Sequence, residues 1–220
     1  MKPLVIFGAG DLAEVAHFYF RHDTPRDVVA FTIDEAYLKE ELFLGMPLVP
    51  FERLEERFPP HEFDLFVAVS YAKVNAFRAK KVSEAKQRGY ELATYISSKA
   101  TVWPGLEVGS NCFVLEDNTI QPFVRIGANV TLWSGNHIGH HATIRDDCFI
   151  TSHVVVSGGV TVGEGTFIGV NATVRDHVTI GRQCVIGAGS LILQDAADFS
   201  VFTMPAADLS KVPSTRLRRI

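Results

Sequence analysis

Residues 100–195 divide without a gap into sixteen groups of six: ATVWPG LEVGSN CFVLED NTIQPF VRIGAN VTLWSG NHIGHH ATIRDD CFITSH VVVSGG VTVGEG TFIGVN ATVRDH VTIGRQ CVIGAG SLILQD. In every group the third residue is Ile, Leu or Val, and the fourth is Gly in seven of the sixteen groups. Chance does not keep an aliphatic residue at one position through so many groups. We therefore interpret the pattern as a true internal repeat.

The six-residue period fits neither the 3.6-residue turn of an α-helix nor the two-residue alternation of a β-strand. It fits a coil of three short flat sides joined by sharp corners, where the aliphatic residue points inward and a small residue lets the chain turn. Eighteen residues make one coil, and coils stacked at the ~4.8 Å strand spacing give a prism roughly 25 Å tall. The sequence thus predicts an all-β left-handed parallel β-helix over residues 98–220, including a C-terminal tail.

Cys112, Cys148 and Cys184 all occupy the first position of their groups and follow one another at intervals of 36 residues. This spacing places the thiols two coils apart, roughly 10 Å, which is too far for a disulfide. The odd count and the lack of a CxxC pair also disfavour a disulfide scaffold or a thiolate zinc site. We expect small core residues in a reducing compartment.

The overall composition excludes several classes of protein. The chain has 220 residues, 47% of them hydrophobic, and a formal net charge of −4. It has no broad basic field for nucleic acid or an anionic membrane, and no apolar run reaches the ~18 residues of a membrane span. The N-terminus lacks the pattern of a signal peptide. We expect a cytoplasmic protein with no nucleic-acid or membrane partner.

Residues 1–97 follow a different pattern, in which strands alternate with helices. We expect strands at 2–7, 28–34, 63–70 and 90–97, and helices at 12–23, 51–58 and 72–89. This alternation is typical of a parallel α/β sheet, so we predict a short Rossmann-like N-terminal domain.

The first expected strand runs into a glycine-rich turn. Residues 8–13 read GAGDLA, a G-x-G-x-x-A pattern, and Asp34 lies about 20 residues beyond it. Such a turn at a helix N-terminus favours a phosphate. The domain is short for a full dinucleotide fold. We therefore favour a nucleotide-diphosphate sugar over NAD, with a purely structural turn as the remaining interpretation.

The GAGD turn, FTIDE, FVAVSYAKVNAFRAKK, the six-residue groups and the closing VFTMPA together resemble the bacterial sugar acyltransferases of the PglD and NeuD type. The resemblance implies acyl transfer from acetyl-CoA to an amine or hydroxyl of a nucleotide-linked or activated sugar. It also implies a homotrimer without a metal, in which the N-terminal domain holds the nucleotide. CoA would lie in the groove between neighbouring β-helices.

An amine that attacks a thioester must lose a proton, and an imidazole is suited to accept it. His140 stands two residues after Ile138, near an expected corner, and the resemblance implies that His140 is the general base. Gly158 lies one coil later. The resemblance implies that its N–H stabilises the oxyanion or the CoA carbonyl.

The family usually follows its base with an acidic residue, but this chain has His141 there. Three interpretations remain open. Either Asp146 or Asp147 orients His140, or His141 is itself the base, or solvent takes the proton. The family also often has a second histidine where this chain has Phe149.

The resemblance carries two further sets of residues to this sequence. For the nucleotide sugar they are Gly10, Asp11, Leu12, Asp34, Glu35 and Ser70, and for CoA they are Phe149, Gly158, Val170 and Ala188.

We predict an N-acetyltransferase acting on the amino group of a nucleotide-linked amino sugar in the synthesis of a surface glycan such as lipopolysaccharide O-antigen. The first alternative is an O-acetyltransferase of the sialic-acid type. A hydroxyl needs a stronger base, and no carboxylate follows His140, so the amine is favoured. The others are a β-helix zinc lyase and a non-catalytic nucleotide-sugar-binding protein.

Overall fold

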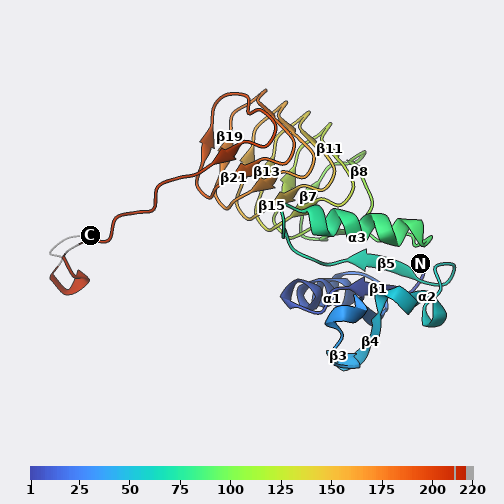
Figure 1. The fold of residues 1–220 in the computed structure, drawn as a ribbon. Helices are drawn as coiled ribbons and strands as arrows, with labels where there is room; N and C mark the ends of the chain where they lie inside the picture. The colour runs from blue at the N-terminus through green and yellow to red at the C-terminus, as the bar shows by residue number, and fades with distance from the viewer. Residues whose placement is uncertain (211, 217–220) are drawn as a thin grey trace.

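The computed structural model describes residues 1–210 and 212–216 and contains two packed parts (Figure 1). In the N-terminal part, a five-stranded sheet has the order β3-β4-β2-β1-β5. Its strands are β1 (Leu4–Phe7), β2 (Val28–Ile33), β3 (Leu42–Phe43), β4 (Met46–Pro50) and β5 (Asp64–Val67). All pair in parallel except β3, which is antiparallel to β4. The helices are α1 (Asp11–Asp23), α2 (Leu54–Arg57) and α3 (Ala76–Gln87), with short 3-10 turns η1 (Glu35–Tyr37) and η2 (Phe51–Arg53).

This arrangement confirms the predicted α/β domain but corrects three of its elements. The β3–β4 hairpin was not expected. The helix expected at 72–89 begins only at Ala76, because Lys73, Val74 and Asn75 have φ of 54°, 51° and 65°, outside the right-handed helical region. The strand expected at 90–97 is divided: Leu92 forms an isolated parallel bridge with Leu65 of β5 in the N-terminal sheet, and β6 (Tyr95–Ile96) pairs with the β-helix.

The rest of the chain is the predicted left-handed parallel β-helix, a prism with three flat sides. Side one holds β7 (Thr101–Val102), β10 (Thr119–Ile120), β13 (His137–Ile138), β16 (Val155–Val156), β19 (Thr173–Val174) and β22 (Leu191–Ile192). Side two holds β8 (Glu107–Val108), β11 (Arg125–Ile126), β14 (Thr143–Ile144), β17 (Thr161–Val162) and β20 (Thr179–Ile180). Side three holds β6, β9 (Phe113–Val114), β12 (Thr131–Leu132), β15 (Phe149–Ile150), β18 (Phe167–Ile168), β21 (Val185–Ile186) and β23 (Val201–Phe202).

The predicted phase of the repeat is confirmed by the interior. Two-residue strands 18 residues apart pair in parallel, as Ile120 does with Ile138, whereas β21 pairs with β23, which is 16 residues later. The inward aliphatic residues stack into one buried cluster, and Cys112, Cys148 and Cys184 lie in it as free, buried thiols. Burial raises the pKa of Cys148 to about 12, so this thiol is an inert core group.

Three edges separate the sides, and each is a column of two-residue corners. The histidine edge, between sides one and two, has corners at 122–123, 140–141, 158–159 and 176–177. The seam edge, between sides two and three, has corners at 110–111, 128–129, 146–147 and 164–165. The cavity edge, between sides three and one, has corners at 134–135, 152–153, 170–171 and 188–189.

The seam edge carries a ladder of polar side chains that begins in the N-terminal sheet. Val67 of β5 donates its amide hydrogen to Asn111 Oδ1 at 2.7 Å, and Asn111 Nδ2 donates to Asn129 Oδ1 at 2.8 Å. One coil further, Asn129 Nδ2 donates to Asp147 Oδ1 at 2.6 Å. The ladder therefore connects the end of β5 to three successive coils.

Helix α3 lies along the same side of the prism (Figure 1) and adds two buried side chains to the seam. Asn75, directly before the helix, donates from Nδ2 to the Gly165 carbonyl at 2.9 Å. Arg78 is 1% exposed, and its guanidinium donates to Thr131 Oγ1 and to the carbonyl oxygens of Asn129, Asp147 and Cys148. The seam thus fixes the position of α3, and with it one wall of the cavities described below.

The C-terminal segment leaves the prism after β23 and extends away from it (Figure 1). It contains one short 3-10 turn, η3 (Ser214–Arg216). Part of the tail expected to run to residue 220, at 211 and 217–220, lies outside the described residues. Among the helices that the structure describes, none combines the length and apolarity needed to cross a membrane.

Candidate functional site

A cavity of about 880 Å³, here called the junction cavity, lies where the glycine-rich turn meets the prism. Its walls bring together six residues predicted for the site: Gly10, Asp11, Leu12, Ser70, Phe149 and Val170. Thr151 and Ser152 add hydroxyl groups from the prism, and Trp133 adds an aromatic ring. The cavity combines an apolar wall with a few polar groups, as small-molecule sites do.

The glycine-rich turn has the backbone geometry that the sequence pattern predicted. Gly8 follows β1 with φ of +135°, and a Cβ at this position would lie 2.6 Å from the Ala68 carbonyl oxygen. Helix α1 begins at Asp11, directly after Gly10. A Cβ on Gly10 would meet nothing within 4 Å, so the backbone is open to the junction cavity at this point.

A second cavity of about 1100 Å³, the outer cavity, shares the wall formed by Gly8, Ala9, Val69, Ala72 and Phe77 with the junction cavity. Lys39, Lys73 and Lys80 line it, together with the aromatic rings of Tyr37 and Phe43. One extended ligand could therefore occupy both cavities, with its anionic part near the lysines.

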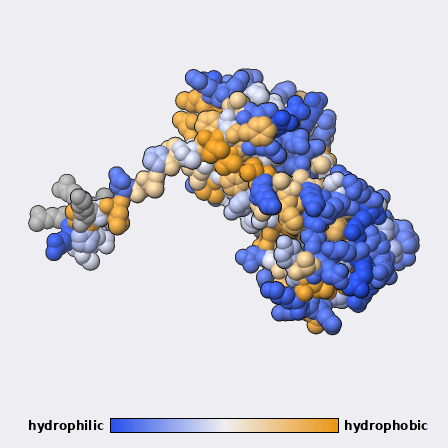
Figure 2. Space-filling view, viewed as in Figure 1, coloured by the Kyte–Doolittle hydropathy of each residue, from blue (hydrophilic) through white to orange (hydrophobic). Residues whose placement is uncertain are grey.

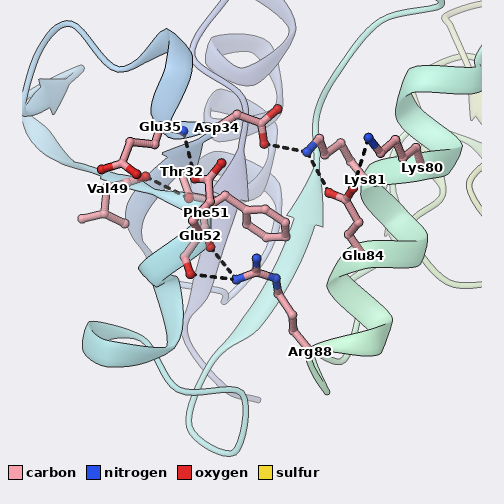
Figure 3. A network of polar contacts seen from close by, with 10 residues as sticks. All are labelled: Thr32, Asp34, Glu35, Val49, Phe51, Glu52, Lys80, Lys81, Glu84 and Arg88. Carbon is pink, nitrogen blue, oxygen red and sulfur yellow. Dashed lines mark hydrogen bonds and ion pairs between the residues drawn. The ribbon is translucent and has the colours of Figure 1, made fainter.

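Asp34 lies at the wall of the outer cavity, and its charge is already compensated (Figure 3). Lys81 Nζ lies 2.6 Å from Asp34 Oδ1 and 2.7 Å from Glu84 Oε2. Burial alone would lower the pKa of Lys81, but the hydrogen bonds to Asp34 and Glu84 outweigh it and raise that pKa. Asp34 is therefore held in place as one partner of an ion-paired cluster.

Glu35, predicted beside Asp34 for the same ligand, lies elsewhere. Its carboxylate pairs with Arg53 at 2.7 Å, and both side chains are more than half exposed. Glu35 is not part of either cavity wall. The structure therefore separates Glu35 from the other predicted sugar-binding residues.

His140, His141 and Gly158 come together on the histidine edge. The His140 amide donates to Gln121 Oε1 at 2.8 Å, and its imidazole Nδ1 lies 3.1 Å from His141 Nδ1. The His140 ring covers Gly158, where an added Cβ would be 2.9 Å from Nε2. The His141 ring packs on Phe123 with the ring centroids 4.7 Å apart.

The two aspartates considered as partners of His140 are bonded elsewhere. Asp146 Oδ1 accepts from the Ala128 amide at 2.8 Å, and Asp147 Oδ1 accepts from Asn129 Nδ2. Both belong to the seam edge, a different corner of the coil. Within one chain, neither carboxylate therefore contacts His140, because β14 (Thr143–Ile144) carries the chain from the histidine edge to the seam edge before Asp146.

The residues predicted for CoA are divided between edges. Gly158 lies on the histidine edge, whereas Val170 and Ala188 lie one above the other on the cavity edge, with side one between the two edges. Phe149, expected along the same groove, is 2% exposed and lies under the Arg78 guanidinium. Within one chain, therefore, Phe149 belongs to the junction cavity and is separate from His140.

Sequence reasoning missed two residues next to the cavities. Tyr71 borders the junction cavity, and its ring packs on Phe149 and Phe167 at centroid distances of 5.1 and 4.8 Å. Its position just after β5 was a usable signal, since ligands of α/β sheets bind at the carboxyl ends of strands. Arg78, which positions α3, had no such signal. Among the described residues, no group of three or more His, Cys, Asp or Glu is placed to hold a metal.

Comparison with known proteins relates the repeat and the whole architecture to acyltransferases. The bacterial transferase hexapeptide family (six repeats) matches residues 123–158 and 159–194. A variant of perosamine N-acetyltransferase from Caulobacter crescentus, solved with CoA and GDP-perosamine, superposes with a TM-score of 0.82 at 27% identity, covering 91% of this chain and 93% of that one.

Two further solved structures share the fold. The acetyltransferase domain of PglB from Neisseria gonorrhoeae superposes with a TM-score of 0.80 at 23% identity, covering 91% of this chain and 96% of that one. WeeI from Acinetobacter baumannii superposes with a TM-score of 0.69 at 15% identity, with the same two coverages. Among curated proteins, none matches the sequence significantly. The chain therefore carries the repeats of the bacterial transferase hexapeptide family on a left-handed β-helix, and its whole architecture is similar to that of perosamine N-acetyltransferase, an acyltransferase of known structure.

Proposed function

We propose that this protein transfers the acetyl group of acetyl-CoA to the amino group of a nucleotide-linked amino sugar. The observation that carries the proposal is the junction cavity, in which a glycine-rich turn of the phosphate-binding type and corners of the hexapeptide prism face one space. The 27% identical perosamine N-acetyltransferase, solved with CoA and GDP-perosamine, supports this choice of substrates.

The two adjoining cavities suggest how such a substrate would lie. The nucleotide would occupy the outer cavity, where Lys39, Lys73 and Lys80 can neutralise its diphosphate. The sugar would reach into the junction cavity past Gly10, whose open backbone leaves room for it. Asp11, Leu12 and Ser70 would then contact the sugar or the adjoining phosphate, and the Phe149 ring would form the cavity floor.

CoA would bind between copies of the chain. The residues predicted for its groove lie on two separate edges of one chain, the histidine edge and the cavity edge, so each edge supplies one wall of a groove. In a homotrimer, the histidine edge of one copy would face the cavity edge of the next. His140 and Gly158 would then stand opposite Val170 and Ala188, with the pantetheine between them. Exposed apolar residues on side one and its borders support this packing: Trp103, Val155, Leu191 and Leu193. Figure 2 shows hydrophobic surface on the prism beside the start of the C-terminal segment.

The proposed reaction takes place beside His140 and Gly158 on the histidine edge. His140 Nε2 accepts a proton as the sugar nitrogen attacks the thioester carbonyl carbon. The carbonyl oxygen becomes negative, and the Gly158 N–H, which has no hydrogen-bond acceptor among the described residues, donates to it. When the tetrahedral intermediate collapses, the carbon–sulfur bond breaks and the thiolate of CoA leaves with the proton from His140.

We place this reaction in the cytoplasm, which the three free, buried cysteines support. The product would serve the synthesis of a surface glycan such as lipopolysaccharide O-antigen.

The test is thiol release from acetyl-CoA in the presence of GDP-, UDP- and dTDP-linked amino sugars. We expect turnover with one of these sugars and a loss of ~100-fold or more in kcat for His140→Ala. Release with a sialic-acid hydroxyl but with no amine would replace the acceptor in this proposal. Binding of nucleotide sugars without any release would exclude the acyltransfer function.

A further inference from the structure

We propose that His141 is a positioning residue whose Nδ1 accepts a hydrogen bond from Nδ1–H of His140. The inference rests on the proposed function and deepens it, because it names the group that prepares the base. Its direct support is the 3.1 Å separation of the two Nδ1 atoms. Two ring nitrogens at this distance share one proton, since two lone pairs or two N–H groups would repel.

The shared proton can reside on either ring, and only one arrangement is productive. With the proton on His140 Nδ1, the neutral ring has a free lone pair on Nε2, and His141 carries its own proton on Nε2. With the proton on His141 Nδ1, the neutral His140 is protonated on Nε2 and cannot act as a base there. His140 Nε2 is one of the ring atoms that lie over Gly158, the residue proposed to hold the thioester oxygen. The first arrangement is therefore the one that serves catalysis.

The corner constrains the backbone of both histidines, whose side chains are exposed. His141 has φ of 60° at its corner, and its ring packs on Phe123. The Gln121 side chain fixes the His140 amide, and the two imidazole rings meet edge to face with an interplanar angle of 85°. The contact with His141, whose own ring packs on Phe123, is therefore what orients the exposed His140 imidazole.

The charges around the pair are few. The preceding corner carries Pro122 and Phe123, and the following corner carries Gly158 and Gly159. Asp176 and His177 lie one coil beyond, and the His177 ring leans over Gly159. Among the described residues, no carboxylate is hydrogen-bonded to either imidazole. His141 therefore stabilises the protonated His140 as a neutral acceptor, which is weaker than an anionic one.

The test uses two substitutions that the prism already tolerates at equivalent corners. Phe123 and Asp147 occupy the same corner position as His141, with φ of 67° and 63°, so His141→Phe and His141→Asp should both fold. Gln183→Phe is the matched control, because Gln183 is an exposed residue at the same corner position on the seam edge, with φ of 50°.

We expect His141→Phe to lower kcat about 10-fold with KM for acetyl-CoA changed by less than about 2-fold. His141→Asp should recover most of kcat and move the acid limb of the pH–rate profile upward by roughly one pH unit, because its negative charge favours the imidazolium. Gln183→Phe should match the unaltered protein. Full activity in His141→Phe, or an acid limb that does not move in His141→Asp, would overturn the proposal.

A second measurement separates this proposal from the proposed function. The ¹⁵N NMR spectrum of protein labelled at histidine, assigned with the same variants, reports which ring nitrogen carries a proton. We expect His140 protonated at Nδ1 and His141 at Nε2, whether or not an acceptor sugar has been found. The opposite protonation would overturn the proposed direction of the hydrogen bond even if the enzyme is active, whereas absence of turnover with the expected protonation would exclude only the proposed reaction.

Discussion

The guanidinium carbon of Arg78 lies 5.2 Å from the centroid of the Phe149 ring, which places a helix of the N-terminal part directly over a strand of the prism. Burial lowers the pKa of Arg78 to about 10, so the group remains charged at neutral pH although it is 1% exposed. Its charge is balanced by the carbonyl oxygens of the seam edge and by the face of the ring. The same contact closes the floor of the junction cavity, because Phe149 lines it.

Replacement of Arg78 by Met should therefore weaken both stability and substrate binding. The change leaves the carbonyls of Asn129 and Asp147 without a donor, while the Cys148 carbonyl keeps the Thr131 amide, and we expect the free energy of unfolding to fall by about 3 kcal/mol in a denaturant titration. KM for the nucleotide sugar should rise while KM for acetyl-CoA stays nearly constant, because α3 carries Phe77 and Lys80 into the outer cavity. Lys86→Met, an exposed change on the same helix, is the control. Equal stability of the two variants would contradict this role of Arg78.

The prism was predictable because its repeat can be read directly along the sequence. An inward aliphatic residue recurs every six residues, and residues 18 apart lie in neighbouring coils. The position of His140 beside Gly158 therefore followed from counting alone. The same counting placed Val170 and Ala188 on one edge. It did not show which edge faces the N-terminal part, because that depends on contacts between distant residues.

The contacts between the two parts had no periodic signal. Arg78 stands among other cations in FRAKK and reads as part of a solvated helix face, yet it is buried. The residues with positive φ before α3 were also missed, because Val74 is β-branched and the backbone of such residues rarely adopts positive φ. Such strain is tolerated where the surroundings over-determine it, and here Asn75 anchors the segment to the prism.

Asp23, the last residue of α1, makes the contact between this helix and the start of the β-helix dependent on pH. Its carboxylate accepts hydrogen bonds from the side chain and amide of Ser98 and from Tyr95, and these bonds lower the pKa of Asp23 to about 2. A carboxyl with a depressed pKa adds stability above its unfolded value near 4, and the stability is lost as pH falls toward 2. We therefore expect Asp23→Asn to cost about 1 kcal/mol at pH 6, a modest value because solvent screens the group.

The difference between Asp23→Asn and the unaltered protein should shrink as the pH is lowered from 4 to 2, measured by urea unfolding at each pH. Asp27→Asn is the control, since Asp27 is an exposed residue nearby whose side chain has no hydrogen bond among the described residues. A difference that stays constant with pH would assign the effect to packing rather than to the charge of Asp23.

The two glycines of the nucleotide turn should respond differently to Ala. In Gly8→Ala the new Cβ would lie 2.6 Å from the Ala68 carbonyl oxygen in an unfavourable backbone conformation, so we expect a loss of about 2 kcal/mol in stability. In Gly10→Ala the Cβ meets no protein atom within 4 Å but enters the junction cavity. Gly10→Ala should keep its melting temperature and raise KM for the nucleotide sugar about 10-fold. Unchanged KM in Gly10→Ala would remove the turn from the substrate site.

Gly158 offers the sharpest steric test of the proposed catalytic corner. A Cβ there would lie 2.7 Å from Cε1 and 2.9 Å from Nε2 of His140, so the imidazole must turn away from its place in Gly158→Ala. The backbone of Gly158 does not have positive φ, and the ring that must move is exposed, so the fold should tolerate the change. We expect kcat to fall about 100-fold while the melting temperature changes little, because a displaced base no longer reaches the amine. Ser157→Ala, the adjacent residue, should retain kcat, and an active Gly158→Ala variant would show that the base lies elsewhere on the prism.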